Sequence, residues 1–131
     1  MAGRGDVELV RRGYEAFIAG DMEWLNDHLH DTIVWHVGGT GSLAGDHAGR
    51  ENVLALFAKG MQLAVPEFDI HDIAQGEDHV VSVLTMTWRK PNGDSFASRA
   101  VQVFHLSGEQ ILESWFLVED QAGLDAFQDG A

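Results

Sequence analysis

The sequence has 131 residues, a length typical of one domain that buries its own core without disulfides or a metal. Its net charge of −13 comes from 21 acidic and 8 basic residues, which argues against nucleic acids and anionic membranes as partners. No apolar run reaches the roughly 20 residues that span a bilayer, and the absence of cysteine excludes disulfides and cysteine metal ligands. We therefore expect one cytoplasmic domain over residues 1–131, with residues 1–5 disordered.

The first part of the chain has the spacing of two amphipathic helices. Asp6 is a typical cap for the first helix, and Gly20 is a typical end of it. The apolar face of this helix carries Val7, Val10, Tyr14 and Phe17. A second, short helix is expected from Asp21 to about residue 31, packed against the first as a helical hairpin.

A β-branched run at residues 32–37 predicts a strand that places Trp35 and His36 on opposite faces. Residues 38–50 contain five glycines and predict a loop, either a flap over a pocket or a plain connection. A third helix is expected at residues 51–64, where Pro66 then breaks the pattern. Alternating residues predict strands at about 68–73 and at 80–88, 95–106 and 111–118, and Asp120 is expected to cap a short terminal helix.

The predicted order of elements, α-α-β-α-β-β-β-β-α, indicates an α+β fold. A long antiparallel sheet of this kind curves, and helices laid across its hollow side leave a cone-shaped space. We expect this cone to be a pocket for a small apolar ligand.

Several short stretches along the chain resemble one known superfamily. They are AFIAGD at 16–21, DTIVWHV at 31–37, LAG at 43–45, GRE at 49–51, VQVFHL at 101–106 and WFLVED at 115–120. Together they resemble the nuclear-transport-factor-2-like superfamily, and most closely its branch of SnoaL-like polyketide cyclases and ketosteroid-isomerase-like proteins. The resemblance implies a cystatin-like α+β barrel that works without a cofactor, and a homodimer formed through the outer face of the sheet.

The resemblance also implies roles for particular residues. Ketosteroid isomerases use a carboxylate base, with a tyrosine and a neutral aspartic acid that bind the developing oxyanion. The base position falls on His36, the aspartic acid position falls on Gln102, and Tyr14 lies one residue from the tyrosine position. Because both carboxylates are replaced, steroid isomerisation by the usual groups is not implied.

Two other activities of the superfamily imply different groups. Its epoxide hydrolases resemble an Asp-Arg-Asp arrangement, and this chain has Arg99 but carries Gln102 and Phe116 where carboxylates are needed. The polyketide cyclases resemble the chain best overall. They use an acid–base group near the end of the last strand, where this sequence has Glu119 and Asp120.

We therefore expect a cofactor-independent isomerase, cyclase or dehydratase, an isomerase or lyase that moves a proton on a small apolar carbonyl or polycyclic compound. His36 is the candidate base because histidine titrates near neutral pH, and Gln102 and Tyr14 are candidate hydrogen-bond donors. The other expected pocket residues are Val34, Phe57, Phe104, Ser114, Phe116 and His71, the last of which fits the outer face equally well. The alternative is a non-catalytic binding or dimerisation domain of the same fold, with His36 as a core histidine.

Tryptophan and histidine provide two further expectations. Trp35, Trp88 and Trp115 are expected to face outward and to form an apolar patch for the dimer contact. His28 and His30 lie at a helix end without a clear third ligand, so we expect no metal site.

Overall fold

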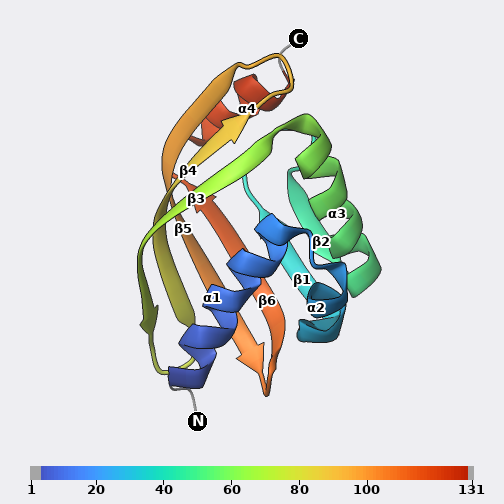
Figure 1. Ribbon diagram of the computed structural model, residues 1–131, viewed down its shortest axis with the longest axis vertical. Helices are drawn as coiled ribbons and strands as arrows, with labels where there is room; N and C mark the ends of the chain where they lie inside the picture. Colours follow the sequence, from blue (N-terminus) through green and yellow to red (C-terminus); the bar gives the residue numbers. More distant parts are fainter. Residues whose placement is uncertain (1–3, 130–131) are drawn as a thin grey trace.

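The computed structural model describes residues 4–129 and shows a curved sheet of six strands with helices on its hollow side (Figure 1). The helices are α1 (Arg4–Ala19), α2 (Met22–His28), α3 (Arg50–Leu63) and α4 (Gln121–Asp129). The strands are β1 (Leu29–Val37), β2 (Gly45–Ala48), β3 (Val65–Gln75), β4 (Val80–Arg89), β5 (Ser95–Ser107) and β6 (Gln110–Val118). The predicted α+β class is confirmed.

The strands follow the order β2-β1-β6-β5-β4-β3 across the sheet. β1 runs parallel to β6 and the other neighbours are antiparallel, so the sheet is mixed rather than wholly antiparallel as predicted. β2 lies within the predicted loop at 38–50 and pairs with the end of β1. The prediction missed it because a four-residue edge strand, largely exposed, has no hydrophobic alternation. Pro66 lies in β3, at the opposite edge, where a missing N–H is tolerated.

The N-terminal helix begins earlier than predicted. α1 starts at Arg4, so Asp6 lies in its first turn instead of capping it. Of the residues expected to be disordered, 4 and 5 belong to α1, and residues 1–3 lie outside the described part of the chain. Asp21 does cap α2, because its Oδ1 accepts a hydrogen bond from the Trp24 backbone N–H over 3.1 Å.

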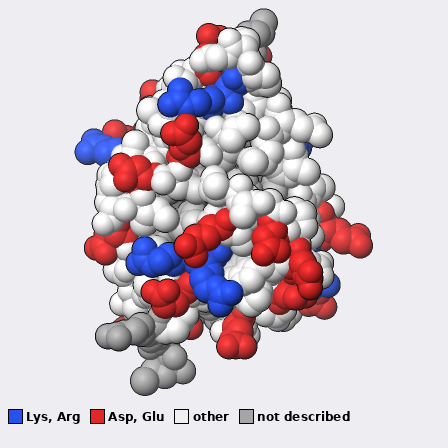
Figure 2. Space-filling view, viewed as in Figure 1, with Lys and Arg blue, Asp and Glu red and all other residues white. Residues whose placement is uncertain are grey.

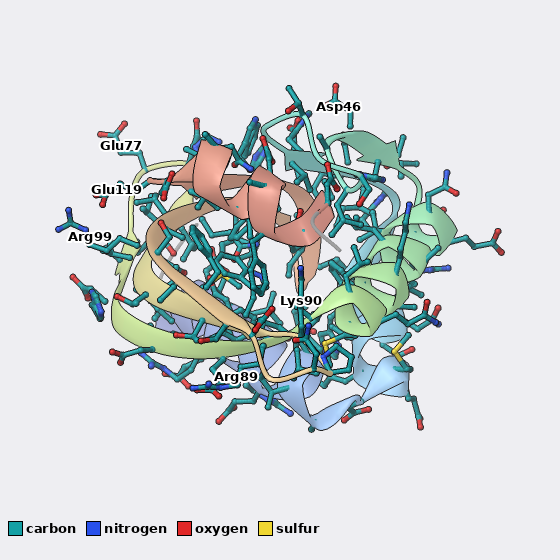
Figure 3. All side chains as sticks on the ribbon, turned by 90° about the horizontal axis from the view of Figure 1, so that it is seen from above. Asp46, Glu77, Arg89, Lys90, Arg99 and Glu119 are labelled. Carbon is teal, nitrogen blue, oxygen red and sulfur yellow. The ribbon has the colours of Figure 1, made fainter. Side chains whose placement is uncertain are left out.

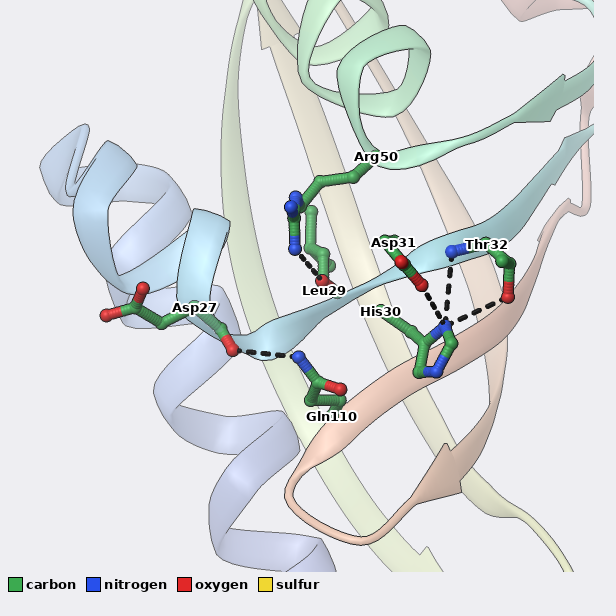
Figure 4. Close-up of polar contacts among 7 residues, drawn as sticks. All are labelled: Asp27, Leu29, His30, Asp31, Thr32, Arg50 and Gln110. Carbon is green, nitrogen blue, oxygen red and sulfur yellow. Dashed lines mark hydrogen bonds and ion pairs between the residues drawn. The ribbon is translucent and has the colours of Figure 1, made fainter.

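Side-chain hydrogen bonds fix the point where α2 passes into β1 (Figure 4). Arg50, at the start of α3, donates to the backbone oxygen of Leu29 over 3.3 Å. Gln110, at the start of β6, donates to the backbone oxygen of Asp27 over 3.2 Å. One short segment is thereby joined to both α3 and β6, which sets how β1 enters the sheet.

Alternation along the strands separates an inner face from an outer face. On β5, Ala100, Gln102 and Phe104 are buried beneath the helices, whereas Val101 and Val103 point to the other side. In the described part of the chain, no helix covers that outer face (Figure 1). The buried core therefore lies entirely between the inner face and the helices.

Charged residues are distributed over the surface rather than gathered into one basic patch. Figure 2 shows acidic and basic side chains interspersed on the face that carries α1, around a middle area without charge. Viewed from the α4 end, the labelled side chains of Asp46, Glu77, Arg99 and Glu119 lie at the periphery of the fold (Figure 3). Among the described helices, none has the length and apolar character needed to cross a membrane.

Candidate functional site

A cavity of about 150 Å³ lies between the inner face of the sheet and helices α1, α3 and α4. Its wall is mainly apolar and rich in aromatic rings. The aromatic residues of the wall are Tyr14, Phe17, Trp35, Phe57, Phe68, Trp88, Phe104 and Phe116. Within the described part of the chain, no residue of the wall carries a charge or an imidazole ring.

Edge-to-face ring contacts build this wall. The ring of Trp35 meets that of Phe57 with centroids 4.9 Å apart, which joins β1 to α3. The ring of Tyr14 meets that of Phe68 at 5.1 Å, which joins α1 to β3. Such pairs hold ring orientation as well as burying area, so the cavity has a defined shape.

Tyr14 and Gln102 form a buried polar pair in the wall. The Tyr14 hydroxyl donates to Gln102 Oε1 over 2.8 Å, and Gln102 Nε2 donates to the Ser114 hydroxyl over 3.3 Å. Burial raises the pKa of Tyr14 well above its usual value, so the hydroxyl stays protonated and acts as a donor. Ser82 is paired with Gln102 across β4 and β5, and its hydroxyl near Tyr14 acts against burial by lowering the pKa of Tyr14.

The segment between β1 and β2 is fastened to α4 by a carboxylate. Asp125 accepts hydrogen bonds from the Thr40 backbone N–H over 2.9 Å and from Gln121 Nε2 over 2.9 Å. The bond from the Thr40 backbone is the main reason why the pKa of Asp125 is lowered, followed by the bond from Gln121. Leu43 from this segment and Leu124 from α4 both line the cavity, so the fastening closes this end of it.

His36 does not line the cavity. Its Nδ1 lies 2.7 Å from Asp46 Oδ1 and its Nε2 lies 2.6 Å from Glu113 Oε2, and the ring stacks on Trp115. These contacts are on the outer face, so the prediction that His36 faces the pocket is wrong. The register of β1 against β6 shifts between Leu29 and Val34. Counting residues from Asp31 therefore does not locate the position in β1 that faces the pocket.

Several other predicted pocket residues also lie elsewhere. Val34 is on the outer side of β1, and His71 is exposed, where its Nε2 lies 3.1 Å from the Thr85 hydroxyl. Ser114 is fully buried, but it contacts Gln102 instead of lining the cavity. Phe57, Phe104 and Phe116 do line the cavity, together with Tyr14 and Gln102.

The two carboxylates at the end of β6 do not reach the cavity. Glu119 forms an exposed ion pair with Arg99 at 2.7 Å. Asp120 accepts a hydrogen bond from the Gly123 backbone N–H over 2.9 Å, so it caps α4 as predicted.

The tryptophan prediction is wrong for two residues and right for one. Trp35 and Trp88 line the cavity, because the inner face of β1 and β4 is the one that carries them. Trp115 faces outward as predicted.

No group of three or more metal-ligating side chains was found among the described residues. His30 Nδ1 accepts a hydrogen bond from the Thr32 backbone N–H over 3.1 Å (Figure 4), and His28 stacks on Trp24.

Sequence reasoning missed two polar residues of the cavity wall, Gln121 and Gln128 in α4. With Leu124 they have the spacing i, i+3 and i+7, which places all three on one face of the helix. That spacing is the signal that could have found them. The signal is weak because glutamine is polar and does not contribute to an apolar repeat.

Comparison with known proteins gives the following matches. A family model described as SnoaL-like domain matches residues 10–114. No curated protein matches the sequence significantly. Among solved structures, Bal32a from a soil-derived mobile gene cassette is 26% identical, with a TM-score of 0.87 over 95% of this chain and 96% of that one.

Two further structures share the fold at lower identity. A protein of unknown function from Burkholderia pseudomallei, described as NTF2-like, is 17% identical, with a TM-score of 0.86 over 98% of this chain and 100% of that one. A candidate SnoaL-like polyketide cyclase from Jannaschia sp. CCS1 is 18% identical, with a TM-score of 0.76 over 97% of this chain and 94% of that one. The fold is the one described for such neighbours as cystatin-like or NTF2-like.

Proposed function

The chain belongs to the SnoaL-like domain family, and from its cavity we propose that it binds a small, apolar, ring-containing molecule. The observation that carries this proposal is the composition of the wall. Aromatic and aliphatic side chains surround the space, and the Tyr14–Gln102 pair is a polar point within it. Such a site favours a flat apolar body with a hydroxyl or carbonyl oxygen placed against the pair.

Binding of 4-hydroxybiphenyl and of plain biphenyl tests this proposal. An NMR titration that follows the Gln102 side-chain amide reports occupancy of the cavity. Tyr14→Phe removes one hydroxyl and keeps the ring. It should therefore lower the affinity for 4-hydroxybiphenyl by about threefold to tenfold, the range of one neutral hydrogen bond. The same variant should leave the affinity for biphenyl unchanged.

His36→Gln is the matched control for Tyr14→Phe. Since His36 lies on the outer face, this variant should bind both compounds like the wild type. The proposal fails if neither compound binds saturably, or if Tyr14→Phe lowers the affinity for both compounds to the same degree.

The second candidate function is catalysis of a cyclisation or isomerisation. It is favoured by the protonated Tyr14 hydroxyl, which is a suitable donor to a carbonyl that gains negative charge. The described wall holds no basic group, so such an enzyme would act by confinement and hydrogen bonding rather than by a histidine base. Turnover of polycyclic ketones, followed by mass spectrometry, should then be lost in Tyr14→Phe and retained in His36→Gln.

A homodimer through the outer sheet face is part of the proposal. Val83 is 42% exposed and Leu117 is 53% exposed, and both lie in one row across this uncovered face with Val101 between them. A second copy of the chain would cover this row, since exposed aliphatic residues in the middle of a sheet are typical of an interface.

A further inference from the structure

The cavity wall contains two separate pairs of hydroxyl- or amide-bearing side chains. Tyr14 and Gln102 form the first pair, on α1 and β5. Gln121 and Gln128 form the second pair, both on α4. A ligand that meets both pairs has to present polar atoms at two points with apolar surface between them.

Strand register gives the separation of the two pairs. Val37 pairs with Phe116, and Phe116 pairs with Gln102, so Gln102 lies two strands from Val37, about 10 Å at the usual strand spacing. Gln121 lies against the residue after Val37, because a Cβ added to Gly38 would be 3.4 Å from Gln121 Oε1. The two pairs therefore lie at separate points of the wall, and Phe116 lies on the strand between Gln102 and Val37.

Both glutamines of the second pair have hydrogen-bonding atoms that can contact a ligand. Gln121 Nε2 donates to Asp125 Oδ1 over 2.9 Å, which fixes the amide and leaves its Oε1 as an acceptor. Gln128 has no hydrogen-bond partner among the described residues, although it lines the cavity. Its Oε1 would be 3.3 Å from a Cβ on Gly41, so the amide lies where the 38–44 segment meets α4.

We infer that the ligand is an elongated molecule with a hydrogen-bonding oxygen at each end. One oxygen meets the Tyr14–Gln102 pair, and the other meets Gln128 on α4. Charge at the α4 end is mixed, because Asp125 stands there and the Lys90 ammonium lies 4.5 Å from the centre of the Phe127 ring. This inference rests on the proposed binding function and adds the length and the second polar end.

Two probes of one shape test the inference. They are 4-hydroxybiphenyl and 4,4′-dihydroxybiphenyl, titrated into the wild type and into Gln128→Met by calorimetry. In the wild type, the diol should bind about threefold to tenfold more tightly than the mono-alcohol, the range of one added neutral hydrogen bond.

Gln128→Met keeps the length of the side chain and removes the amide. It should abolish the advantage of the diol and leave the affinity for the mono-alcohol unchanged. Gln62→Met is the control, because Gln62 is exposed on α3 and does not line the cavity. It should keep the wild-type ranking.

Different outcomes separate this inference from the proposed function. Equal affinity for mono-alcohol and diol in the wild type, or a diol advantage that persists in Gln128→Met, would overturn the inference. Either result leaves the binding function standing, because the mono-alcohol still binds. Failure of both probes to bind would contradict the binding function and the inference with it. If Gln128→Met does not fold, the wild-type ranking of the two probes decides.

Discussion

The ring of His36 lies between two carboxylates on the outer face of the sheet. Both ring nitrogens can donate to Asp46 and Glu113 at the same time only when the ring is protonated, because a neutral imidazole carries one N–H. The bond to Glu113 is the main cause that raises the pKa of His36, followed by the bond to Asp46. His36 thereby connects β1 to both of its neighbours, β2 and β6.

This geometry predicts a pH dependence of stability. The pKa of His36 is higher in the folded chain than in the unfolded chain, so its contribution is complete below the unfolded pKa and is lost as pH rises through the folded pKa. Thermal unfolding of the wild type and His36→Gln should therefore differ more at pH 6 than at pH 9. The difference should be at most about 1 kcal/mol, because ion pairs near the surface contribute little. An equal difference at both pH values would contradict the bridging role.

At the scale of elements, the segment between β1 and β2 depends on Gly39. Its φ is +86°, in the left-handed region, and an added Cβ would lie 2.4 Å from Asp125 Oδ1. Gly39→Ala would strain the backbone and force Asp125 away from Thr40. We expect this variant to lower the melting temperature and to loosen the 38–44 segment, which faster hydrogen exchange at the Thr40 amide would report.

Gly93→Ala is the matched control for Gly39→Ala. Gly93 has a φ of +99°, but an added Cβ would meet no atom within 4 Å. Its replacement should cost about 1 kcal/mol from the backbone alone. If both variants lose the same stability and Thr40 exchange is unchanged, Asp125 does not fasten the segment.

The elements themselves differ in how well sequence predicts them. The strands at 80–88, 95–106 and 111–118 were predicted to within a residue or two, because the alternation of their side chains is continuous. The inward face of β1 was predicted wrongly, although Trp35 and His36 were correctly placed on opposite sides. Both faces of β1 carry partly buried side chains, so alternation alone does not say which face meets the helices.

The candidate site was predictable in part of its aromatic wall and in its Tyr14–Gln102 pair, but not in the glutamines of α4. The family resemblance indicated Gln102 and the neighbourhood of Tyr14, and the cavity contains both. The spacing of Gln121 and Gln128 indicates that they share a helix face, but no local pattern specifies how α4 folds back over the end of β6. His36 was chosen for its chemistry, and chemistry does not determine the face of a strand.

At the scale of the whole molecule, the proposed dimer depends on the outer face of the sheet. Leu117→Asp places a charge in the middle of this face, and a two-fold contact would bury that charge twice. Ile18→Asp is the matched control, because it adds the same charge away from the outer face. Ile18 lies on α1 and is 50% exposed. We expect light scattering to show a dimer for the wild type and for Ile18→Asp. For Leu117→Asp, we expect dimerisation to be weakened by at least about tenfold, so that monomer is favoured. A monomeric wild type at high concentration, or equal behaviour of the two variants, would show that this face is not the contact.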